Sequence, residues 1–428
     1  MIKIYEYGKM DNAEIFAREN PTANVSGVVT GIIAEVVQKG DAALKAYAEK
    51  FDGVVLDCLE VTREEIEAAY EKADEKFLAV LEEAAANIRE FHSKQIRGGF
   101  SIKRADGVVI GQKVTPIEKV GLYVPGGTAA YPSTVLMDAI PAKLAGCAEI
   151  VMVTPPAKDG GVNPDILAAA KVAGVTRIFK VGGAQAIAAL AYGTESIPKV
   201  DKIVGPGNAY VAEAKKQVFG KVDIDMIAGP SEILVVADST CNPVFVAADL
   251  LSQAEHDKMA SAVLVTDSMQ LAKAVSAELE KQIPLLPRRE IARKSIDDHG
   301  KIIVAENLSV AIEISNEIAP EHLELCVENP FAWLDKVKHA GSVFMGKYCP
   351  EALGDYFAGP NHTLPTSGTA KFSSPLSVDD FVKKTQFSYY TETALEKVAD
   401  KIALFADKEG LHAHGKSATV RFERQKEE

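Results

Sequence analysis

The chain of 428 residues has few cysteines, no long basic run and no long apolar stretch. Its five cysteines form no CxxC pair, which argues against a disulfide framework and a thiolate zinc site. A nucleic-acid-binding surface needs basic side chains, whereas the formal net charge is −13. No window approaches the roughly 20 apolar residues of a membrane span, and the N-terminus is charged throughout, unlike a signal peptide. We therefore expect a cytoplasmic protein that binds neither nucleic acid nor membrane.

The dinucleotide fingerprint G-x-G-x-x-G is also missing. The segment 205–210, GPGNAY, comes nearest and lacks the last glycine. Four Gly/Pro-rich turns are nevertheless predicted at strand ends, at 125–127, 182–183, 205–207 and 229–230. Ligands of open α/β sheets bind outside the carboxyl ends of the strands, so these turns are where a ligand is expected. A dinucleotide would have to bind in another mode than at the usual first turn.

What is present is an alternation of short apolar runs and amphipathic stretches. The predicted strands are 120–124, 150–153, 177–181, 233–237 and 262–266, and the helices that follow them are 133–145, 164–173, 184–191, 244–253 and 269–282. Strands that alternate with helices imply parallel sheets built from right-handed βαβ units. The length of the alternating region indicates more than one sheet.

Helices are predicted before and after this region. Residues 62–91 are expected to form one long helix, opened by a capping box of Thr62 and Glu65. The tail beyond about residue 376 shows no alternation and predicts a helical arm. Its helix is expected to open at Thr393 and to stop at Gly410.

Two pairs of residues could bind a metal. Gln253 and His256 are three residues apart, which on a helix places both on one face. From spacing alone they are either metal ligands or the polar end of a helix, and glutamine is an unusual zinc ligand. Asp355 and His362 are predicted in a Gly/Pro-rich loop, as a site or as an Asx-turn with a surface histidine.

Two further groups are candidates for a functional site. Glu321 and His322 follow Pro320, which suits the first turn of a helix, so Glu321 could serve the helix dipole or act as an acid or base. Glu409 is expected at a helix end, where its charge opposes the dipole. His412 and His414 would face the same way only on extended backbone, and a frayed helix end is the alternative.

Eight segments, in this order, resemble the histidinol dehydrogenase family from about residue 20 to 422. They are GLYVPGGTAAYPSTVLM (121–137), GGAQAIAALAYGT (182–194), KIVGPGNAYV (202–211), AGPSEILVVAD (228–238), DLLSQAEH (249–256), APEHLEL (319–325), GPNHTLPTSGTA (359–370) and EGLHAH (409–414). Any one of them could occur by chance, but eight in the order of the family are very specific.

The resemblance implies a function and its site residues. It implies two successive NAD-dependent oxidations of L-histidinol, through L-histidinaldehyde to L-histidine, the final steps of histidine biosynthesis. One zinc would be held by Gln253, His256, Asp355 and His414, while His412 matches no family position. Glu321 would activate water, His322 would be the general base, and the metal would hold the substrate. Substrate would also meet Ser231, His362 and Glu409, and NAD would contact Tyr123, Gln185 and Asn208. Thr363, beside His362, carries no implied role.

The resemblance also implies an α/β fold of two incomplete Rossmann-like domains, like that of aldehyde dehydrogenases, with N- and C-terminal helical extensions. The expected domains are an extension (1–18), a zinc and substrate domain (19–122 with 231–376), an NAD-contacting domain (123–230) and a C-terminal arm (377–428). The family forms homodimers in which the arm completes the partner's site.

Three other functions would be compatible with parts of this sequence. A cysteine-dependent aldehyde dehydrogenase would share the fold but needs an activated thiolate, and only Cys326 lies next to one of the motifs. An inactive metabolite-binding relative would have lost Glu321, His322 or a metal ligand, and all are present. A zinc hydrolase would not reduce NAD.

Overall fold

A computed structural model describes residues 2–9, 12–18, 25–126 and 130–423. Gly127 of the predicted turn 125–127 and the predicted domain start at residue 19 lie outside these residues. The chain divides into two compact units. The first comprises Met1–Gln95 and Ile117–Phe381, and the second comprises Ile96–Pro116 and Val382–Glu428.

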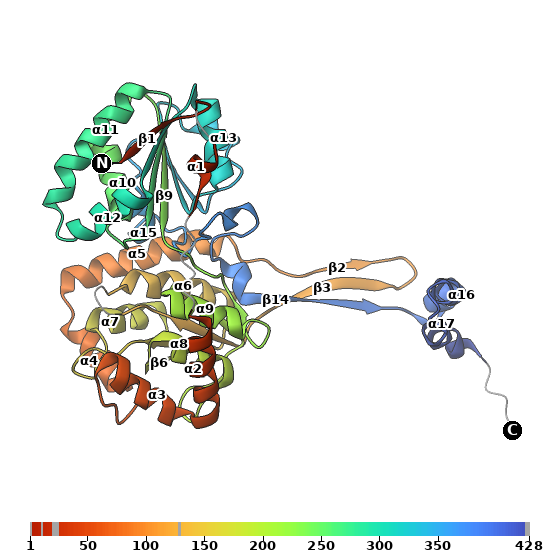
Figure 1. Ribbon diagram of the computed structural model, residues 1–428. Coiled ribbons are helices and arrows are strands. Elements are labelled where there is room, and N and C mark those ends of the chain that lie inside the picture. Colours follow the sequence, from red (N-terminus) through yellow and green to blue (C-terminus); the bar gives the residue numbers. More distant parts are fainter. Residues whose placement is uncertain (1, 10–11, 19–24, 127–129, 424–428) are drawn as a thin grey trace. The chain divides into compact units, whose positions relative to one another are not determined.

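The first unit contains two fully parallel sheets (Figure 1). In spatial order, the six-stranded sheet consists of β1 (Lys3–Glu6), β11 (Lys301–Val304), β10 (Ser261–Thr266), β9 (Glu232–Ala237), β12 (His322–Cys326) and β13 (Ser342–Met345). The five-stranded sheet consists of β6 (Arg177–Lys180), β5 (Glu149–Thr154), β4 (Lys119–Tyr123), β7 (Lys202–Val204) and β8 (Asp223–Ile224). Counted from β9 and from β4, the strands of both sheets follow the Rossmann order 3-2-1-4-5, with β1 added beside β11 at the edge of the six-stranded sheet, and this confirms the predicted fold class.

Helices cover both faces of the six-stranded sheet because its central strand is apolar on both. Ile233 and Val235 of β9 pack in a core with α10 (Pro243–Ala254), α11 (Met269–Gln282) and α12 (Arg289–His299). Leu234 and Val236, which point the other way, pack with α13 (Leu308–Ile318) and with Ile15 of α1 (Asn12–Phe16). Figure 1 shows α10, α11 and α12 on the opposite side of this sheet from α13. The short helices α14 (Phe331–Leu334) and α15 (Glu351–Tyr356) follow β12 and β13 along the chain.

The five-stranded sheet is also covered on both faces. One core joins it to α2 (Ser26–Lys39), α3 (Asp41–Tyr47), α8 (Gly183–Tyr192) and α9 (Ala209–Val218). The other joins it to α4 (Arg63–Lys72), α5 (Glu75–Ser93), α6 (Pro132–Ala145) and α7 (Pro164–Ala173). This differs from the predicted grouping of residues 19–122 with 231–376, since α2–α5 pack on the five-stranded sheet. An amphipathic stripe shows that a helix packs on something, but it does not say on which sheet.

The predicted single helix over 62–91 is wrong at one point. Thr62 and Glu65 do form the capping box, but α4 ends at Lys72 and Ala73 adopts an extended conformation. Asp74 then caps α5 by accepting a hydrogen bond from the Phe77 N–H at 2.9 Å. The apolar spacing runs through the break, whereas the N-cap propensity of an aspartate interrupts the backbone there. The ten elements predicted between 120 and 282 all occur, each end within one residue of its prediction.

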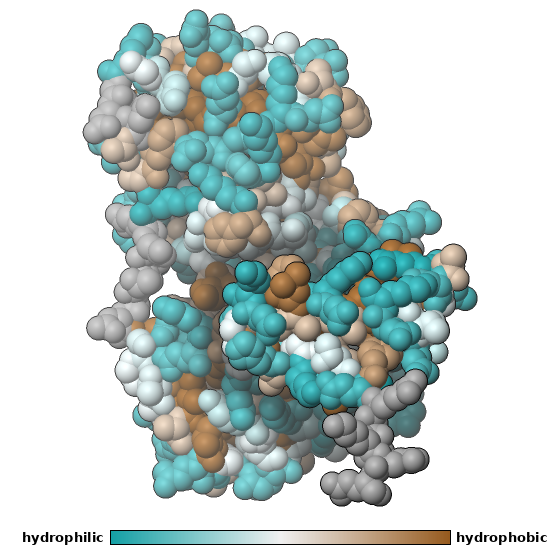
Figure 2. Space-filling view, turned by 90° about the vertical axis from the view of Figure 1, so that its right-hand side faces the viewer, coloured by the Kyte–Doolittle hydropathy of each residue, from teal (hydrophilic) through white to brown (hydrophobic). Residues whose placement is uncertain are grey.

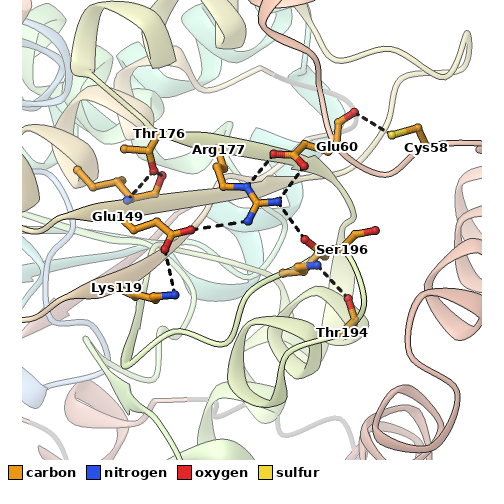
Figure 3. A network of polar contacts seen from close by, with 10 residues as sticks. Cys58, Glu60, Lys119, Glu149, Thr176, Arg177, Thr194 and Ser196 are labelled. Carbon is orange, nitrogen blue, oxygen red and sulfur yellow. Dashed lines mark hydrogen bonds and ion pairs between the residues drawn. The ribbon is translucent and has the colours of Figure 1, made fainter.

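Charged side chains close the amino edge of the five-stranded sheet (Figure 3). Arg177, at the start of β6, donates from Nε and Nη2 to the two carboxylate oxygens of Glu60 at 2.7 and 2.8 Å. Glu149, at the start of β5, lies 3.7 Å from Arg177 and 3.2 Å from Lys119, at the start of β4. Each of these charges has a partner of opposite sign at a partly exposed position.

The second unit is an antiparallel sheet followed by two helices. The sheet has the order β14 (Val382–Tyr389), β3 (Val109–Pro116) and β2 (Phe100–Lys103), and the helices are α16 (Glu392–Lys408) and α17 (His412–Thr419). The prediction of a purely helical arm is therefore wrong for β14, whose partner strand lies far away in the sequence. The N-cap of α16 is Thr391 rather than Thr393, whereas Gly410 has the left-handed φ of 73° expected of a stop. No helix of the described residues is long and apolar enough to cross a membrane.

Candidate active site

The predicted acid–base pair lies at the amino edge of the six-stranded sheet. Glu321 and His322 lead into β12, and Ser231 directly precedes the neighbouring strand β9. The predicted helical first turn at Pro320 is wrong: α13 ends at Ile318, Ala319 is left-handed with φ 51°, and a strand follows. Proline is common just beyond a helix end because it cannot continue the helix. The turn Gly229–Pro230 also lies at this amino edge, not at the carboxyl end of a strand as predicted.

Glu321 and His322 are both buried and are held by one backbone residue. The Glu232 N–H donates to Glu321 Oε2, and His322 Nδ1 contacts the Glu232 carbonyl oxygen, each at 2.9 Å. A carbonyl oxygen only accepts, so Nδ1 carries a proton and Nε2 has the free lone pair in the neutral ring. Buried Nε2 has no hydrogen-bond partner among the described residues. This histidine is thus oriented to take up a proton at Nε2.

Two carboxylates of α15 face this histidine. Glu351 is buried, and its Oε1 lies 3.7 Å from His322 Nε2 without a hydrogen bond among the described residues. Its Oε2 accepts from Ser252 Oγ at 3.0 Å, and its N–H donates to Glu324 Oε1 at 2.7 Å. Asp355, one turn on, was predicted in a loop but is helical. Ligand atoms of His322, Glu351 and Asp355 lie within 4.8 Å of one another, a group that could hold a metal ion.

Gln253 and His256 lie at the end of α10. Gln253 is helical, and its buried Oε1 has no partner among the described residues. His256 lies just beyond the helix, and its N–H donates to the Gln253 carbonyl at 3.1 Å. His256 and Asp355 line one cavity of about 330 Å³, whose other walls include apolar side chains of α5 and α6. The structure thus brings the predicted ligands His256 and Asp355 to a common cavity.

Burial and mutual charge change the acidity of these groups. Burial raises the pKa of Glu321 well above its usual range. Burial, and then the charge of Asp355, raises the pKa of Glu351 to about 8. Burial would raise the pKa of Asp355, but the hydrogen bond and charge of His362 outweigh it and lower that pKa, while the pKa of His362 is raised despite burial. Burial lowers the pKa of His256. Shifts of this kind are typical of functional sites.

The predicted cofactor residues lie at the carboxyl edge of the five-stranded sheet. Tyr123 ends β4, and its hydroxyl oxygen accepts from the Gly183 N–H at 3.1 Å at the start of α8. Gln185 is buried in the first turn of α8, and Asn208 caps α9 by accepting from two backbone N–H groups. The chain reverses its direction of strand addition at β4, and ligands of such sheets bind at this switch point. A side chain at Gly205 would come within 2.2 Å of the Tyr123 carbonyl oxygen, so this turn requires glycine.

Glu409 and His414 belong to the second unit. Glu409 directly follows the last residue of α16 and caps its end, as predicted, and His414 lies in α17. The extended spacing considered for His412 and His414 is wrong, since both are helical and residues two apart on a helix face different ways. His412 Nδ1 contacts Asp407 Oδ1 at 2.8 Å, and both histidines are exposed.

Sequence reasoning missed Glu351 and its contact with Glu324, and it missed the role of Glu232, which holds Glu321 and His322. Glu324 is the only acidic side chain in strand β12, between two leucines, and its position in an apolar strand could have marked it as a candidate from the sequence. Glu351 resembled an ordinary acidic residue in a first helical turn, and Glu232 acts through its backbone atoms, which no residue type reveals.

Residues 17–422 of this chain match the histidinol dehydrogenase family model. The chain belongs to the histidinol dehydrogenase family. The histidinol dehydrogenase of Clostridium acetobutylicum is 56% identical over 99% of both chains, and that of Listeria monocytogenes is 58% identical over 95% of both. The crystal structure of histidinol dehydrogenase from Elizabethkingia anophelis superposes with a TM-score of 0.93 at 40% identity and covers 98% of each chain. The family indicated by the eight motifs is therefore confirmed, and the chain is an oxidoreductase of the histidinol dehydrogenase family.

Proposed function

We propose that the chain oxidises L-histidinol to L-histidine through L-histidinaldehyde, in two steps that each reduce one NAD. Membership of the histidinol dehydrogenase family carries this proposal. The buried pair of Glu321 and His322 supports it, since a base with a free ring nitrogen and a carboxylate of raised pKa are the two proton acceptors that the reaction needs.

His322 acts in the first oxidation. A bound NAD would supply the hydride acceptor, and His322 Nε2 would take up the hydroxyl proton of the alcohol. The bond from Nδ1 to the Glu232 carbonyl holds the ring in the tautomer that accepts at Nε2. Glu351 Oε1 lies 3.7 Å from Nε2, and a positive charge on His322 would in turn favour the ionised form of Glu351 by lowering its pKa.

Glu321 acts in the second oxidation. The aldehyde has to be hydrated before a second hydride can leave, and a carboxylate can remove the proton of the attacking water. The raised pKa of Glu321 makes it a stronger base than an exposed carboxylate. The Glu232 N–H holds one of its oxygens at 2.9 Å and so orients the carboxylate.

The residues of the site fit a divalent metal. Gln253 Oε1 and Glu351 Oε1 are buried oxygens without partners among the described residues, and such atoms are costly unless something binds them. Imidazole nitrogen and carboxylate oxygen are donors that suit zinc. We assign Gln253, His256 and Asp355 to the ion, together with His414. A bound zinc would supply an electrophilic anchor for the imidazole and amine nitrogens of the substrate. Ser231, His362 and Glu409 are assigned to substrate contacts.

We assign NAD to the carboxyl edge of the five-stranded sheet, in contact with Tyr123, Gln185 and Asn208. Helices α8 and α9 begin at this edge, and the N-terminus of a helix favours phosphate groups. The five-stranded sheet is accordingly the NAD-contacting domain in this proposal, and the six-stranded sheet carries the zinc and the substrate.

We further propose a homodimer in which the second unit completes the partner's site. Large apolar side chains are exposed on α16 and directly after α17, among them Leu404 and Phe405 of α16 and Val420. Figure 2, which faces the side of α16 and α17 in Figure 1, shows apolar patches among hydrophilic ones on this element. In a two-fold symmetric dimer, each chain would cover the apolar patches of the other, so that the same patch is buried on both chains.

The cysteine-dependent alternative finds no support. Cys326 is buried at the carboxyl end of β12, the end opposite His322, and its Sγ lies 3.1 Å from Cys241 Sγ. The contact with Cys241 and burial raise the pKa of Cys326, whereas a catalytic thiol needs a lowered pKa.

The test is NADH formation from L-histidinol by the purified chain, with and without a chelator. We expect two NADH per L-histidine formed, loss of activity on chelation and recovery when zinc is restored. Activity that survives chelation but is lost on thiol alkylation would refute the zinc assignment in favour of the cysteine mechanism. Absence of NADH from both L-histidinol and L-histidinaldehyde would refute the proposed function.

A further inference from the structure

The loop that carries His362 is attached to α6 through three consecutive residues. Asn361 Nδ2 donates to the Met137 carbonyl at 2.6 Å. His362 Nε2 lies 3.2 Å from Thr134 Oγ1. Thr363 Oγ1 donates to Asp138 Oδ1 at 3.0 Å. The three contacts fall on one turn of α6.

The burial of Asp138, which accepts the hydrogen bond of Thr363, is costly for the fold. Asp138 is fully buried among apolar residues of α6, and its Oδ2 has no hydrogen-bond partner among the described residues. Burial, and then the charge of Asp225, raises the pKa of Asp138 to about 7. An apolar side chain at this position would avoid the cost of an unsatisfied buried oxygen. A local cost of this kind is expected where a residue serves function.

The position of α6 indicates which function the contact between Thr363 and Asp138 serves. The helix follows β4, whose last residue Tyr123 is assigned to NAD, and it holds one ring nitrogen of His362 through Thr134. The other ring nitrogen, Nδ1, lies 3.5 Å from Asp355 Oδ1. One helix therefore connects the cofactor side of the molecule to the residue that faces a candidate metal ligand.

We propose that Asp138 and Thr363 are a positioning pair that holds His362 in place for the substrate. The pair touches neither substrate nor metal, and it acts by fixing the loop between Asn361 and Thr363. This inference rests on the proposed function, which supplies the contact of His362 with L-histidinol. The family resemblance implies no role for Thr363, whereas in this proposal Thr363 contributes to the affinity for the substrate.

The test uses Thr363→Val, which keeps the shape and removes the hydroxyl. Loss of one hydrogen bond predicts a rise of roughly three- to tenfold in the KM for L-histidinol. The kcat, the KM for NAD and the metal content should stay at wild-type values. Thr363→Ser, which keeps the hydroxyl, is the matched control and should retain the wild-type KM. Asp138→Leu should raise the KM as Thr363→Val does, and the double variant should add little to either change.

Hydrogen exchange of the backbone at 361–363 gives a readout that needs no activity. Faster exchange in Thr363→Val, together with the raised KM, supports the pair. Faster exchange with an unchanged KM, or additive effects in the double variant, would overturn the positioning role. If the wild-type chain does not oxidise L-histidinol, the proposed function fails, while the exchange rates still report whether the pair holds the loop. Unchanged exchange rates would overturn the inference even in an active enzyme.

Discussion

The two parallel sheets have the same strand order, but their amino edges are built differently. At the five-stranded sheet, Arg177, Glu60, Glu149 and Lys119 form a chain of partly exposed ion pairs. At the six-stranded sheet, His322, Glu321 and Glu351 are buried, and His322 Nε2 is without a partner among the described residues.

This difference distinguishes two kinds of edge. We call the amino edge of the five-stranded sheet the structural edge and that of the six-stranded sheet the reactive edge. An ion pair that is partly exposed to water contributes little to the free energy of folding. Its charged groups are already paired with one another, so they are not available for proton transfer or metal binding. A desolvated group with an unfilled hydrogen-bonding position costs stability and has an altered pKa, which suits proton transfer and metal binding. The state of the charged groups therefore distinguishes the two edges, whereas strand order does not.

The largest expected effect tests the reactive edge directly. His322→Asn should lower kcat by about 10²–10⁴ for L-histidinol, whose hydroxyl group then loses its base, and it should also impair L-histidinaldehyde, because the hydrate formed with the help of Glu321 must give up a hydroxyl proton as well. Glu321→Gln keeps the shape but not the basicity, and it should slow the aldehyde more than the alcohol. Single-turnover measurements from each substrate separate the steps. Glu149→Gln, at the structural edge, is the matched control and should leave both rates unchanged. Equal losses for both substrates in Glu321→Gln would contradict its role with water.

The second test asks which buried groups hold the ion. His256→Ala should lower metal affinity by more than about 100-fold, because a ligand matters more than a residue that only supports one. Glu351→Gln should lower it less, and His299→Ala, at the end of α12, should not change it. Metal content after dialysis measures this, against about one zinc per wild-type chain. If Glu351→Gln lost more metal than His256→Ala, the ion would belong to the group of His322, Glu351 and Asp355 instead.

A smaller effect tests whether the second unit completes a partner's site. Inactive His256→Ala chains are mixed with inactive His414→Ala chains, and subunits are allowed to exchange. If His414 serves the other chain, a heterodimer has one site that contains both substitutions and a second site that contains neither. A random mixture should then recover roughly a quarter of wild-type activity.

The control for this mixture replaces His414→Ala with His412→Ala, since His412 contacts Asp407 instead. That variant should be active by itself. Heterodimers that form without any recovered activity would show that His414 acts within its own chain.

The smallest effect is expected at the structural edge. Arg177→Met should lower the free energy of unfolding by about 1 kcal/mol or less, since Arg177 and Glu60 are each about one-third exposed and screened by water. The kcat should not change. Denaturant unfolding at low and high salt, with Glu60→Gln to complete a double-mutant cycle, measures the pair. A loss of activity without a loss of stability would remove the distinction between the two edges.

Much of the local structure could be predicted from the sequence. The capping box of Thr62 and Glu65 and the stop at Gly410 formed as expected, because each involves atoms only a few residues apart. The same reasoning failed at Pro320, which suits either a helix start or the residue after a helix end. It also failed for β14, because this strand pairs with β3, which lies far from it in the sequence.

The site was predictable in its residue types but not in its geometry. His256 and Asp355 were singled out and do line one cavity, yet Asp355 is helical and Glu351 was missed. A glutamate at the start of a helix has the same sequence pattern whether it points into water or towards a buried histidine. Burial in the folded chain distinguishes the two, and burial is a long-range property.

The sequence by itself determined the alternation of strands and helices between residues 120 and 282, the capping box of Thr62 and Glu65, and the membership of the histidinol dehydrogenase family. These follow from periodicity over a few residues and from motifs that lie along the chain. Only the tertiary structure decided that α2–α5 cover the five-stranded sheet and that Glu321 and His322 lie at an amino edge. It also decided that Nε2 of His322 is free while Nδ1 is bound. These features depend on which distant segments exclude water from one another, and this is settled only when the whole chain has packed.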